Sequence, residues 1–571
     1  MNRPPSKLPI GFYFFALSLT FILLGNSIRS NRELPTFTPV SKSVEFVPTL
    51  LAHAEGTAIG TNLAGAIDYS TEYPFVDLFK MSRPWIPQSN DEFNTREYDA
   101  LDLDERGWVR SLPETNAPVR YRRVVTLMHY YNGGEFVVLY DGEGTLEYSL
   151  DVQKDRSNSQ PGRDLLVAKK PSDVRIGMNV VATDPNKTGN YIRNIRVLPA
   201  EFESTYQETI FNPVFLARVA PFSALRFMDW MSTNNSDQQE WSNRPQVDDA
   251  RYSVKGVPLE LMIRLANALN VDPWFTIPHR ATDEYVANFA QLVREQLDRG
   301  RHVYVEYTNE AWNSIFEQFH WLLNNGIVTA ADEPDDYRRI LTSYTLRALQ
   351  IGDIWRENFQ DNGRTTVVLG TQTASRYVAD VVTSYLEWAP PGSYSHGFDA
   401  LAITGYFGRS MGAPGNEEVV QSWLDGAQGD PFQIAIAQLK DGSILGSNDS
   451  LVHVKDDFEY YKQLVVEHPH LKELLAYEAN SHVAGYQGVQ NNEELTRFFI
   501  ELHRRPEFYD LYTQLLETWQ DSDGVRTLFM NFSSIGTPTK YGSWGVLESV
   551  EQTSSPRYSA LVDFIARQQA S

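Results

Sequence analysis

In the C-terminal two-thirds of the chain, short hydrophobic runs alternate with longer amphipathic stretches. Several of these stretches carry hydrophobic residues at steps of three and four, which is typical of helices packed on a core. Seven of the short runs have the length and the β-branched or aromatic content of buried strands: residues 222–227, 271–277, 303–307, 366–369, 398–403, 474–477 and 525–529. An eighth run, at residues 58–63, lies far upstream of the others.

Eight strands separated mostly by helices predict an α/β fold, and a (β/α)8 TIM barrel accounts best for that number. An open doubly wound sheet has the same alternation, but no glycine-rich dinucleotide-binding motif supports it. We therefore expect residues 54–85 to supply the first barrel strand and its loop, and residues 201–571 to supply the remainder of the barrel.

Residues 86–200 have a different pattern, in which short β-type runs follow one another directly. Turn sequences such as Asn132-Gly133-Gly134 and Asp184-Pro185-Asn186 separate the runs. The runs cover residues 120–129, 136–140, 145–150, 165–169, 174–182 and 191–197. Short strands at this spacing predict an inserted all-β, sandwich-like domain after the first barrel strand.

The N-terminal residues have the character of a targeting segment. Arg3 and Lys7 precede an apolar run from residue 10 to residue 24, which has the length of a signal-peptide core and is short for a membrane span. We expect residues 1–27 to be a signal peptide or an uncleaved N-terminal anchor, followed by a linker at residues 28–53. The expected location is secreted, periplasmic or anchored at the cell surface, with membrane contact only through that anchor.

Composition narrows the range of functions. The formal net charge is -23 and no cluster of Lys and Arg occurs, so we expect no nucleic-acid partner, because phosphate backbones are bound by clustered cations. The chain has no Cys, which excludes thiolate metal ligands and a Cys nucleophile. Aromatic residues make up 12% of the chain, and their flat faces suit both core packing and stacking on sugar rings.

Polar and aromatic residues stand at the ends of the predicted barrel strands, where the working residues of such barrels lie. In strand order they are Arg226, Trp230, His279, Asn309, Glu310, Trp312, Gln372, Tyr406, Glu478 and Trp544. Two of them are carboxylic acids, and hydrolysis of an acetal needs two: one protonates the leaving oxygen, and the other, ionised, attacks the sugar or stabilises its cation. The expected partner is therefore a polysaccharide or an oligosaccharide.

Two short motifs make the pattern more specific. Asn309-Glu310 at the end of the fourth strand and Tyr477-Glu478-Ala479 at the end of the seventh resemble the large clan of retaining glycoside hydrolases with TIM barrels. The resemblance covers about residues 201–564 and the first strand, as a pattern rather than as close identity. It departs from a compact clan member in the 168 positions between the two glutamates and in the inserted β domain. Insertions in barrel loops account for both differences.

The resemblance implies a role for each site residue. Glu310 corresponds to the acid/base and Glu478 to the nucleophile, while Asn309 would bind the 2-hydroxyl of the sugar. Arg226, His279, Tyr406 and Trp544 fall where the clan often has supporting residues. Trp230, Trp312 and Gln372 stand at the same rim as candidate substrate contacts, although tryptophans in such strands are also ordinary core residues.

Glu306 is a second acidic candidate within the fourth strand. It shares strand parity with Glu310, so an undistorted strand turns it inward as well, one layer deeper. A charge at that depth needs a partner such as Arg226. We therefore interpret Glu306 as a buried structural carboxylate.

The leading hypothesis is an exported glycoside hydrolase that acts with retention of configuration. We expect no cofactor and no catalytic metal, because His482 and Asp229 do not form part of a ligand set with recognisable spacing. Two alternatives remain open: a non-catalytic carbohydrate-binding or extracellular-matrix protein on the same fold, and a transglycosylase, in which a sugar replaces water as the acceptor.

Overall fold

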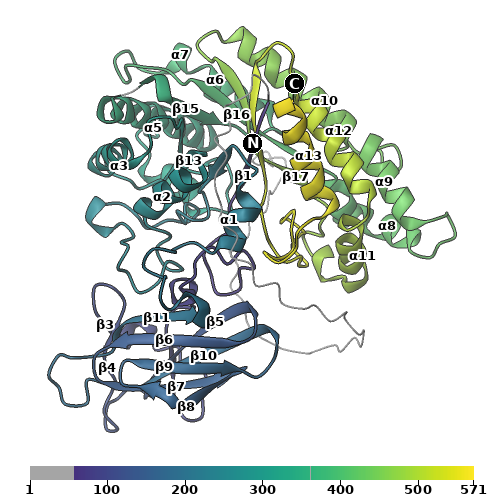
Figure 1. Cartoon of the computed structure of the whole chain (residues 1–571). Coiled ribbons are helices and arrows are strands. Elements are labelled where there is room, and N and C mark those ends of the chain that lie inside the picture. Colours follow the sequence, from purple (N-terminus) through teal and green to yellow (C-terminus); the bar gives the residue numbers. More distant parts are fainter. Residues whose placement is uncertain (1–56, 361, 571) are drawn as a thin grey trace, which may run out of the picture.

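The structure is a computed structural model that describes residues 57–360 and 362–570 (Figure 1). The predictions for residues 1–27 and 28–53 lie outside the described residues. Eight parallel strands form a closed barrel, as the sequence pattern predicted. They are β1 (Ala58–Asn62), β12 (Ala224–Arg226), β13 (Asp272–Ile277), β14 (Val303–Tyr307), β15 (Thr365–Gly370), β16 (Ala400–Phe407), β17 (Glu473–Ser481) and β18 (Arg526–Asn531).

The first strand closes the barrel by pairing with two strands that are far away in the sequence. Thr61 of β1 lies opposite Leu225 of β12 on one side and opposite Asn531 of β18 on the other. All the remaining neighbours also pair in parallel. The C-terminal ends of all eight strands therefore meet at one rim, where barrels of this type place their chemistry.

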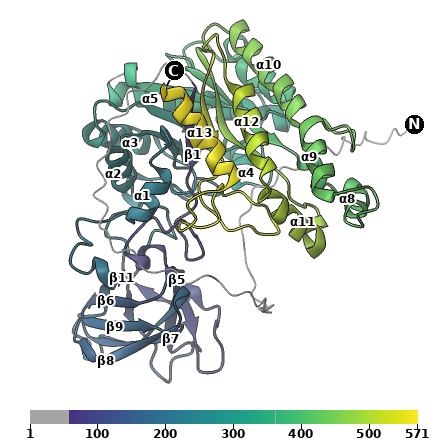
Figure 2. The same cartoon turned by 45° about the vertical axis from the view of Figure 1, so that its right-hand side comes forward.

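Helices cover the outside of the barrel (Figures 1 and 2). The sequence explains their limits: in α3, the Thr282 side chain accepts a hydrogen bond from the backbone N–H of Tyr285 at the first turn, and α2 ends at Asn270, which has a left-handed backbone with φ of 58°. The helices are α1 (Pro213–Val219), α2 (Leu259–Leu269), α3 (Asp283–Gln296), α4 (Glu317–Asn325), α5 (Asp336–Phe359), α6 (Arg376–Thr383), α7 (Tyr385–Trp388), α8 (Glu417–Trp423), α9 (Pro431–Asp441), α10 (Leu451–Glu467), α11 (Glu493–His503), α12 (Glu507–Trp519) and α13 (Pro556–Ala570).

The chain between β1 and β12 builds two four-stranded antiparallel sheets below the barrel in the view of Figure 1. One sheet has the order β2-β5-β10-β7 and the other β11-β6-β9-β8, while β3 and β4 form a small separate pair. The strands are β2 (Ile86–Gln88), β3 (Asp102–Leu103), β4 (Val109–Ser111), β5 (Arg123–Asn132), β6 (Glu135–Asp141), β7 (Gly144–Leu150), β8 (Val152–Gln160), β9 (Arg163–Ala168), β10 (Ser172–Thr183) and β11 (Arg193–Pro199).

Strand β8 is absent from the sequence prediction, which recognised strands by their hydrophobic residues. Its residues are almost all polar, and only Val152 is buried. Pairing with β9 holds β8 in the sheet through backbone hydrogen bonds, which leave no hydrophobic signal in the sequence.

The loop after β1 connects the barrel to these sheets. Asp77 in this loop accepts hydrogen bonds from the backbone N–H groups of Phe79 and of Val197 in β11. Tyr73, also in the loop, contacts Nδ1 of His129 in β5 through its hydroxyl at 2.5 Å, and Nε2 of His129 lies 2.6 Å from Asp173. The contacts of Asp77 and Tyr73 attach the β-rich segment to the loop that follows β1.

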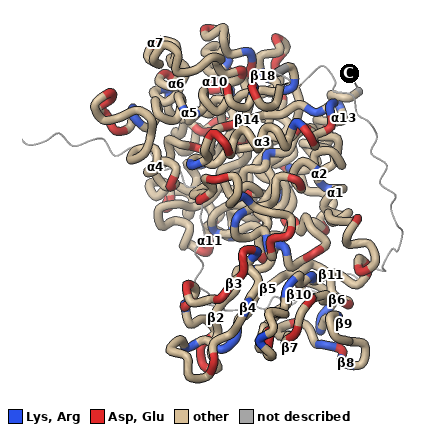
Figure 3. The backbone as a smooth tube through the Cα atoms, turned by 90° about the vertical axis from the view of Figure 1, so that its left-hand side faces the viewer, with Lys and Arg blue, Asp and Glu red and all other residues tan. Residues whose placement is uncertain are grey.

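Charged residues of both signs are spread over the barrel and the β-rich segment (Figure 3). In the described part of the chain, no helix is both long enough and apolar enough to cross a membrane.

Candidate active site

Two predicted catalytic residues lie at the same rim of the barrel. Glu310 lies in the loop that follows β14, and Glu478 lies within β17, which continues to Ser481 instead of ending at Tyr477. In the pairing of β16 with β17, Ile403 lies opposite Ala476 and Thr404 lies opposite Glu478, so Tyr477 is one extra residue in β17. Such a bulge changes the direction of the side chains around it.

Arg226 at the end of β12 connects these strand ends. Its guanidinium donates hydrogen bonds to Oε1 of Glu478 at 2.8 Å and to Oε2 of Glu306 at 2.9 and 3.1 Å. It also donates to the side-chain oxygens of Asn62 at 3.1 Å and Asn309 at 3.0 Å. Arg226 is completely buried, so its charge depends on these acceptors.

Glu306 is the deeper of the acids in this group. It has 1% of its surface exposed, and its Oε2 accepts hydrogen bonds from Arg226 and, at 2.8 Å, from Nε1 of Trp274. The prediction that Glu306 is a buried carboxylate paired with Arg226 is confirmed. Since it has no access to solvent, Glu306 serves to hold Arg226 in place.

Glu478 is held by donors on both of its oxygens. Besides the bond from Arg226 to Oε1, Oε2 accepts a hydrogen bond from the hydroxyl of Tyr406 at 2.9 Å. Burial and the charge of Glu478 keep the pKa of Tyr406 well above its ordinary value, so this hydroxyl stays a donor. The ring of Trp544 packs edge-on against Tyr406, with 5.9 Å between centroids, and limits its movement.

Glu310 has different partners. The hydroxyl of Tyr477 donates to its Oε1 at 3.1 Å, and Nδ2 of Asn313 donates to its Oε2 at 2.9 Å. Glu310 is partly exposed, and both Glu310 and Thr308 have positive φ values, of 41° and 47°. Side chains with a Cβ rarely adopt this backbone conformation, and residues held in it are concentrated at functional sites.

The two carboxyls affect each other's protonation. Burial raises the pKa of both, and the charge of Glu310 raises that of Glu478 further. Arg226 and Tyr406 oppose the rise for Glu478, whereas the direct hydrogen-bond donors of Glu310 are uncharged. Two close carboxylates resist simultaneous ionisation, so the two acids titrate as a pair, and the charged donor Arg226 favours the ionised form of Glu478.

Asn309 is held by three hydrogen bonds with the surrounding protein. Its Oδ1 accepts from Arg226, its Nδ2 donates to Oδ1 of Asn234 at 3.2 Å, and its backbone oxygen accepts from Nε2 of Gln318 at 2.8 Å. Only 2% of its surface is exposed. In this arrangement Asn309 orients Arg226 and the loop that carries Glu310.

His279, predicted as a supporting residue, lies just after β13 and is buried. Its Nε2 accepts a hydrogen bond from Nε of Arg280 at 3.2 Å, which assigns the ring proton to Nδ1. Burial and the neighbouring Arg280 lower its pKa to about 4, so it is neutral at ordinary pH. Its ring packs edge-on against Trp321 of α4, and within the described residues no hydrogen bond joins its side chain to Glu310 or Glu478.

Three other predicted rim residues are not hydrogen-bonded to the two acids in the described structure. Trp230 is completely buried against Phe75 and Phe227, which leaves no ring face for a sugar and corresponds to the core position that the sequence also allowed. Trp312 is also buried, edge-on to Tyr344. Gln372 follows β15 and is partly exposed.

Several residues around the acids were missed by the sequence analysis. Asn62 lies at the end of β1 and binds Arg226, so the rule that site residues occupy strand ends could have found it. Tyr477 and Asn313 lie inside the quoted motif or next to it, but the reach of their side chains has no sequence signal. His482, just after β17, packs against Tyr406 and Trp544, and burial lowers its pKa to about 3, which keeps it neutral.

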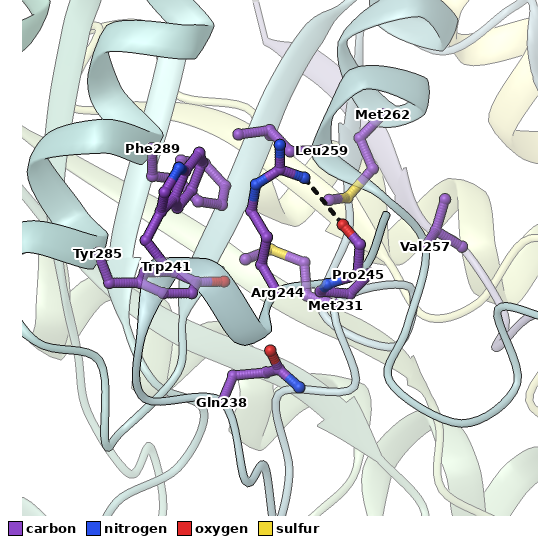
Figure 4. A pocket seen from close by; sticks show the side chains of 10 residues that line it. All are labelled: Met231, Gln238, Trp241, Arg244, Pro245, Val257, Leu259, Met262, Tyr285 and Phe289. Atoms are coloured by element: carbon purple, nitrogen blue, oxygen red, sulfur yellow. Dashed lines mark hydrogen bonds between the residues drawn. The ribbon is translucent and has the colours of Figure 1, made fainter. Parts of the chain in front are cut away.

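A small cavity of about 10 Å³ lies apart from these residues (Figure 4). Its ten lining residues come from α2, α3 and the loop between β12 and α2. The guanidinium of Arg244 lies over the ring of Trp241, 4.4 Å from its centroid. The cavity has room for about one water molecule, and we assign it to helix packing. Among residues 57–360 and 362–570, no group of three or more His, Asp or Glu is arranged to hold a metal ion.

No family model and no curated protein matches the chain. Among solved structures, it is similar to the GH1 beta-glucosidase from Exiguobacterium antarcticum B7, with 11% identity, 62% of this chain and 86% of that chain covered, and a TM-score of 0.35. It is also similar to a mutant of xylanase 10C from Cellvibrio japonicus in complex with xylopentaose, with 9% identity, 86% and 98% covered, and a TM-score of 0.35. It is similar as well to a beta-glucosidase from Thermotoga maritima, with 10% identity, 62% of this chain and 85% of that chain covered, and a TM-score of 0.32. These neighbours are glycosidases, at identities too low to assign a family.

Proposed function

We propose that the chain is a retaining glycoside hydrolase that cleaves poly- or oligosaccharides, with Glu478 as nucleophile and Glu310 as acid/base. The unequal environment of the two carboxyls carries the proposal. Glu478 accepts hydrogen bonds from a guanidinium and a phenol, whereas Glu310 accepts them from a phenol and an amide. A retaining site must keep one carboxyl charged and the other protonated, and this difference supports that division.

In the first step, a carboxylate oxygen of Glu478 bonds to the anomeric carbon while the bond to the leaving oxygen breaks. Glu310 transfers its proton to that oxygen. Glu478 loses its charge as the ester forms, and Arg226 keeps Glu306 as its counter-ion, so no unpaired buried charge is created.

In the second step, Glu310, now ionised, removes a proton from the attacking water. The water oxygen bonds to the anomeric carbon and releases the carboxylate of Glu478, and the two inversions give net retention. Tyr406 and Arg226 stabilise the carboxylate as its charge returns. If a sugar hydroxyl replaces water in this step, the same residues carry out transglycosylation.

The proposal includes export through residues 1–27 and a division of the chain in which residues 86–200 form a domain inserted into the barrel. It requires neither a cofactor nor a metal, because both steps use only carboxyl groups and water. A non-catalytic carbohydrate-binding protein would bind glycans without cleaving them, and its binding would survive neutralisation of both glutamates.

Product analysis tests the proposal directly. We expect the purified chain to cleave at least one member of a broad panel of polysaccharides and oligosaccharides, and proton NMR to show that the first-formed anomer has the configuration of the substrate. A first-formed anomer of the opposite configuration would exclude the nucleophile role of Glu478. Binding without cleavage across the panel would favour the non-catalytic alternative.

Replacement of Glu310 by Gln is expected to slow cleavage of natural glycosides by about 10²–10⁴-fold, because the leaving oxygen no longer receives a proton. Glycosides with a dinitrophenyl leaving group need little protonation. The rate loss in their first step should therefore be at least about tenfold smaller than the loss for natural glycosides. Pre-steady-state release of dinitrophenol measures this step. Glu295→Gln, an exposed change on α3, is the control, and an equal loss for both substrate types contradicts the acid role.

A further inference from the structure

A groove of about 490 Å³ lies on the barrel wall near the candidate site. This volume is in the range of small-molecule sites. Its walls come from the loop between β13 and α3, from the first turn of α3, from α4 and the residues after it, and from the first half of α5. These three helices are labelled in Figure 3. The lining residues used below are Arg280, Asp283, Glu284, Trp321, Ile327 and Arg347.

The groove is connected to the proposed proton donor through α4. This helix begins seven residues after Glu310, and its Gln318 donates a hydrogen bond to the backbone oxygen of Asn309. Trp321, one turn further along α4, lines the groove. On the opposite wall, Arg280 donates to Nε2 of His279, whose ring contacts Trp321. The groove therefore lies beside β13 and β14, on the side of the rim that carries Glu310.

The lining combines an aromatic face with polar groups of both signs. Trp321 is partly exposed and Ile327 has 46% of its surface exposed, so both offer apolar contact. Arg347 pairs with Asp283 at 2.7 Å, while Arg280 makes longer contacts, to Asp237 at 3.4 Å and to Glu317 at 3.3 Å. Arg280 and Arg347 balance the charges of Asp283 and Glu284 within the lining.

These features suit a neutral ligand that has both a flat apolar face and many hydroxyl groups. A sugar ring stacks its C–H face on an aromatic ring, and its hydroxyls exchange hydrogen bonds with guanidinium and carboxylate groups at the edge. A strongly charged ligand would meet repulsion from one pair of lining residues. A purely apolar ligand would remove water from four charged side chains without replacing it.

We propose that this groove is a sugar-binding subsite on the leaving-group side of the scissile bond, and that the substrate is a chain of neutral sugars extending from the catalytic carboxyls past α4. The assignment to the leaving-group side rests on the proposed function, because Glu310 then protonates the leaving oxygen and α4, which follows Glu310 in the chain, forms one wall of the groove. A substrate that occupies the groove extends beyond the cleaved bond on the leaving-group side, so the protein then acts on internal bonds of a polymer. A substrate that ended at the cleaved bond would leave the groove empty.

Binding measured without turnover tests the subsite independently of catalysis. The probes are hexasaccharides of β-1,4-linked glucose, xylose, mannose and galactose, titrated calorimetrically into the full chain carrying Glu478→Gln. We expect at least one hexasaccharide to bind, and Trp321→Ala to weaken that binding about tenfold, as expected for loss of one stacked ring. Trp388→Ala, which removes another partly exposed tryptophan on α7, is the matched control and should leave the affinity unchanged.

A second variant covers the case in which Trp321→Ala disturbs α4. Ile327→Arg places a long charged side chain in the groove from an exposed position, so it should weaken hexasaccharide binding without altering the fold. The proposal is overturned if none of the four hexasaccharides binds, or if the affinity of a bound one is the same in Trp321→Ala and Ile327→Arg as in the parent. If the chain with an intact Glu478 cleaves no glycan but these binding differences occur, the proposed hydrolysis fails while the sugar site stands.

Discussion

Replacement of Glu478 by Ala is expected to lower kcat by at least about 10⁴-fold, because it removes the carboxylate proposed to form the covalent intermediate. The small side chain leaves space for an external nucleophile. With an activated aryl glycoside, azide should restore turnover and give a glycosyl azide of inverted configuration, since only one displacement then occurs. Chromatography and NMR of the product measure both effects.

A suitable control lies on the same strand. Glu473 begins β17 and accepts hydrogen bonds from Thr366 and Thr527 at the opposite end of the barrel. Glu473→Gln should retain most of the activity and should show no response to azide. Activity of Glu478→Ala within about tenfold of the wild type would contradict the nucleophile role.

Replacement of Arg226 by Met is expected to affect both stability and activity. The change leaves the carboxyls of Glu306 and Glu478 buried without their cation, which costs about 3–5 kcal/mol when one member of a buried pair is removed. Activity should be lost as well, because Glu478 then takes up a proton more readily. Urea unfolding and the kcat of the folded variant measure the two effects.

A second substitution separates the effect on stability from the effect on activity. In Arg226→Met/Glu306→Gln one of the two orphaned charges is gone, so part of the stability should return, while activity should stay low because Glu478 still lacks its partner. Arg294→Met removes a partly exposed guanidinium on α3 that donates to the backbone oxygen of Asn358, and it should cost about 1 kcal/mol or less. If Arg226→Met lowered the free energy of unfolding by no more than the control does, the buried network would not depend on this arginine.

The barrel was predictable because its strands are buried on both faces and appear as continuous hydrophobic runs. The limits of the strands were less predictable. β12 is only three residues long although a strand was predicted over residues 222–227, because Phe222 and Phe227 are buried in adjoining loops. β17 is longer than predicted, because its polar end residues Asn480 and Ser481 continue to pair with β16.

The candidate site was predictable as far as strand ends and side-chain parity determine it. The parity of β14 placed Glu306 below Glu310, and the requirement for a counter-charge identified Arg226 as its partner. The contacts of Asn62 and Tyr477 were not predictable. The side chain of Asn62 bonds to the backbone oxygen of Tyr477, 415 positions away, and only the closed barrel determines that these two residues meet.

The extra residue in β17 sets the spacing of the two acids. Neighbouring residues of a regular strand point to opposite faces, but at this bulge the hydroxyl of Tyr477 reaches Glu310 while Glu478, next in the chain, binds Arg226. The guanidinium of Arg226 also lies 5.2 Å from the centre of the Tyr477 ring and holds it in place. Tyr477 thus contacts Glu310, the proposed proton donor, through its hydroxyl, and contacts Arg226, the partner of the proposed nucleophile, through its ring. Deleting that residue would change the gap between the acids, and with it the stereochemical outcome, while the barrel itself could remain closed.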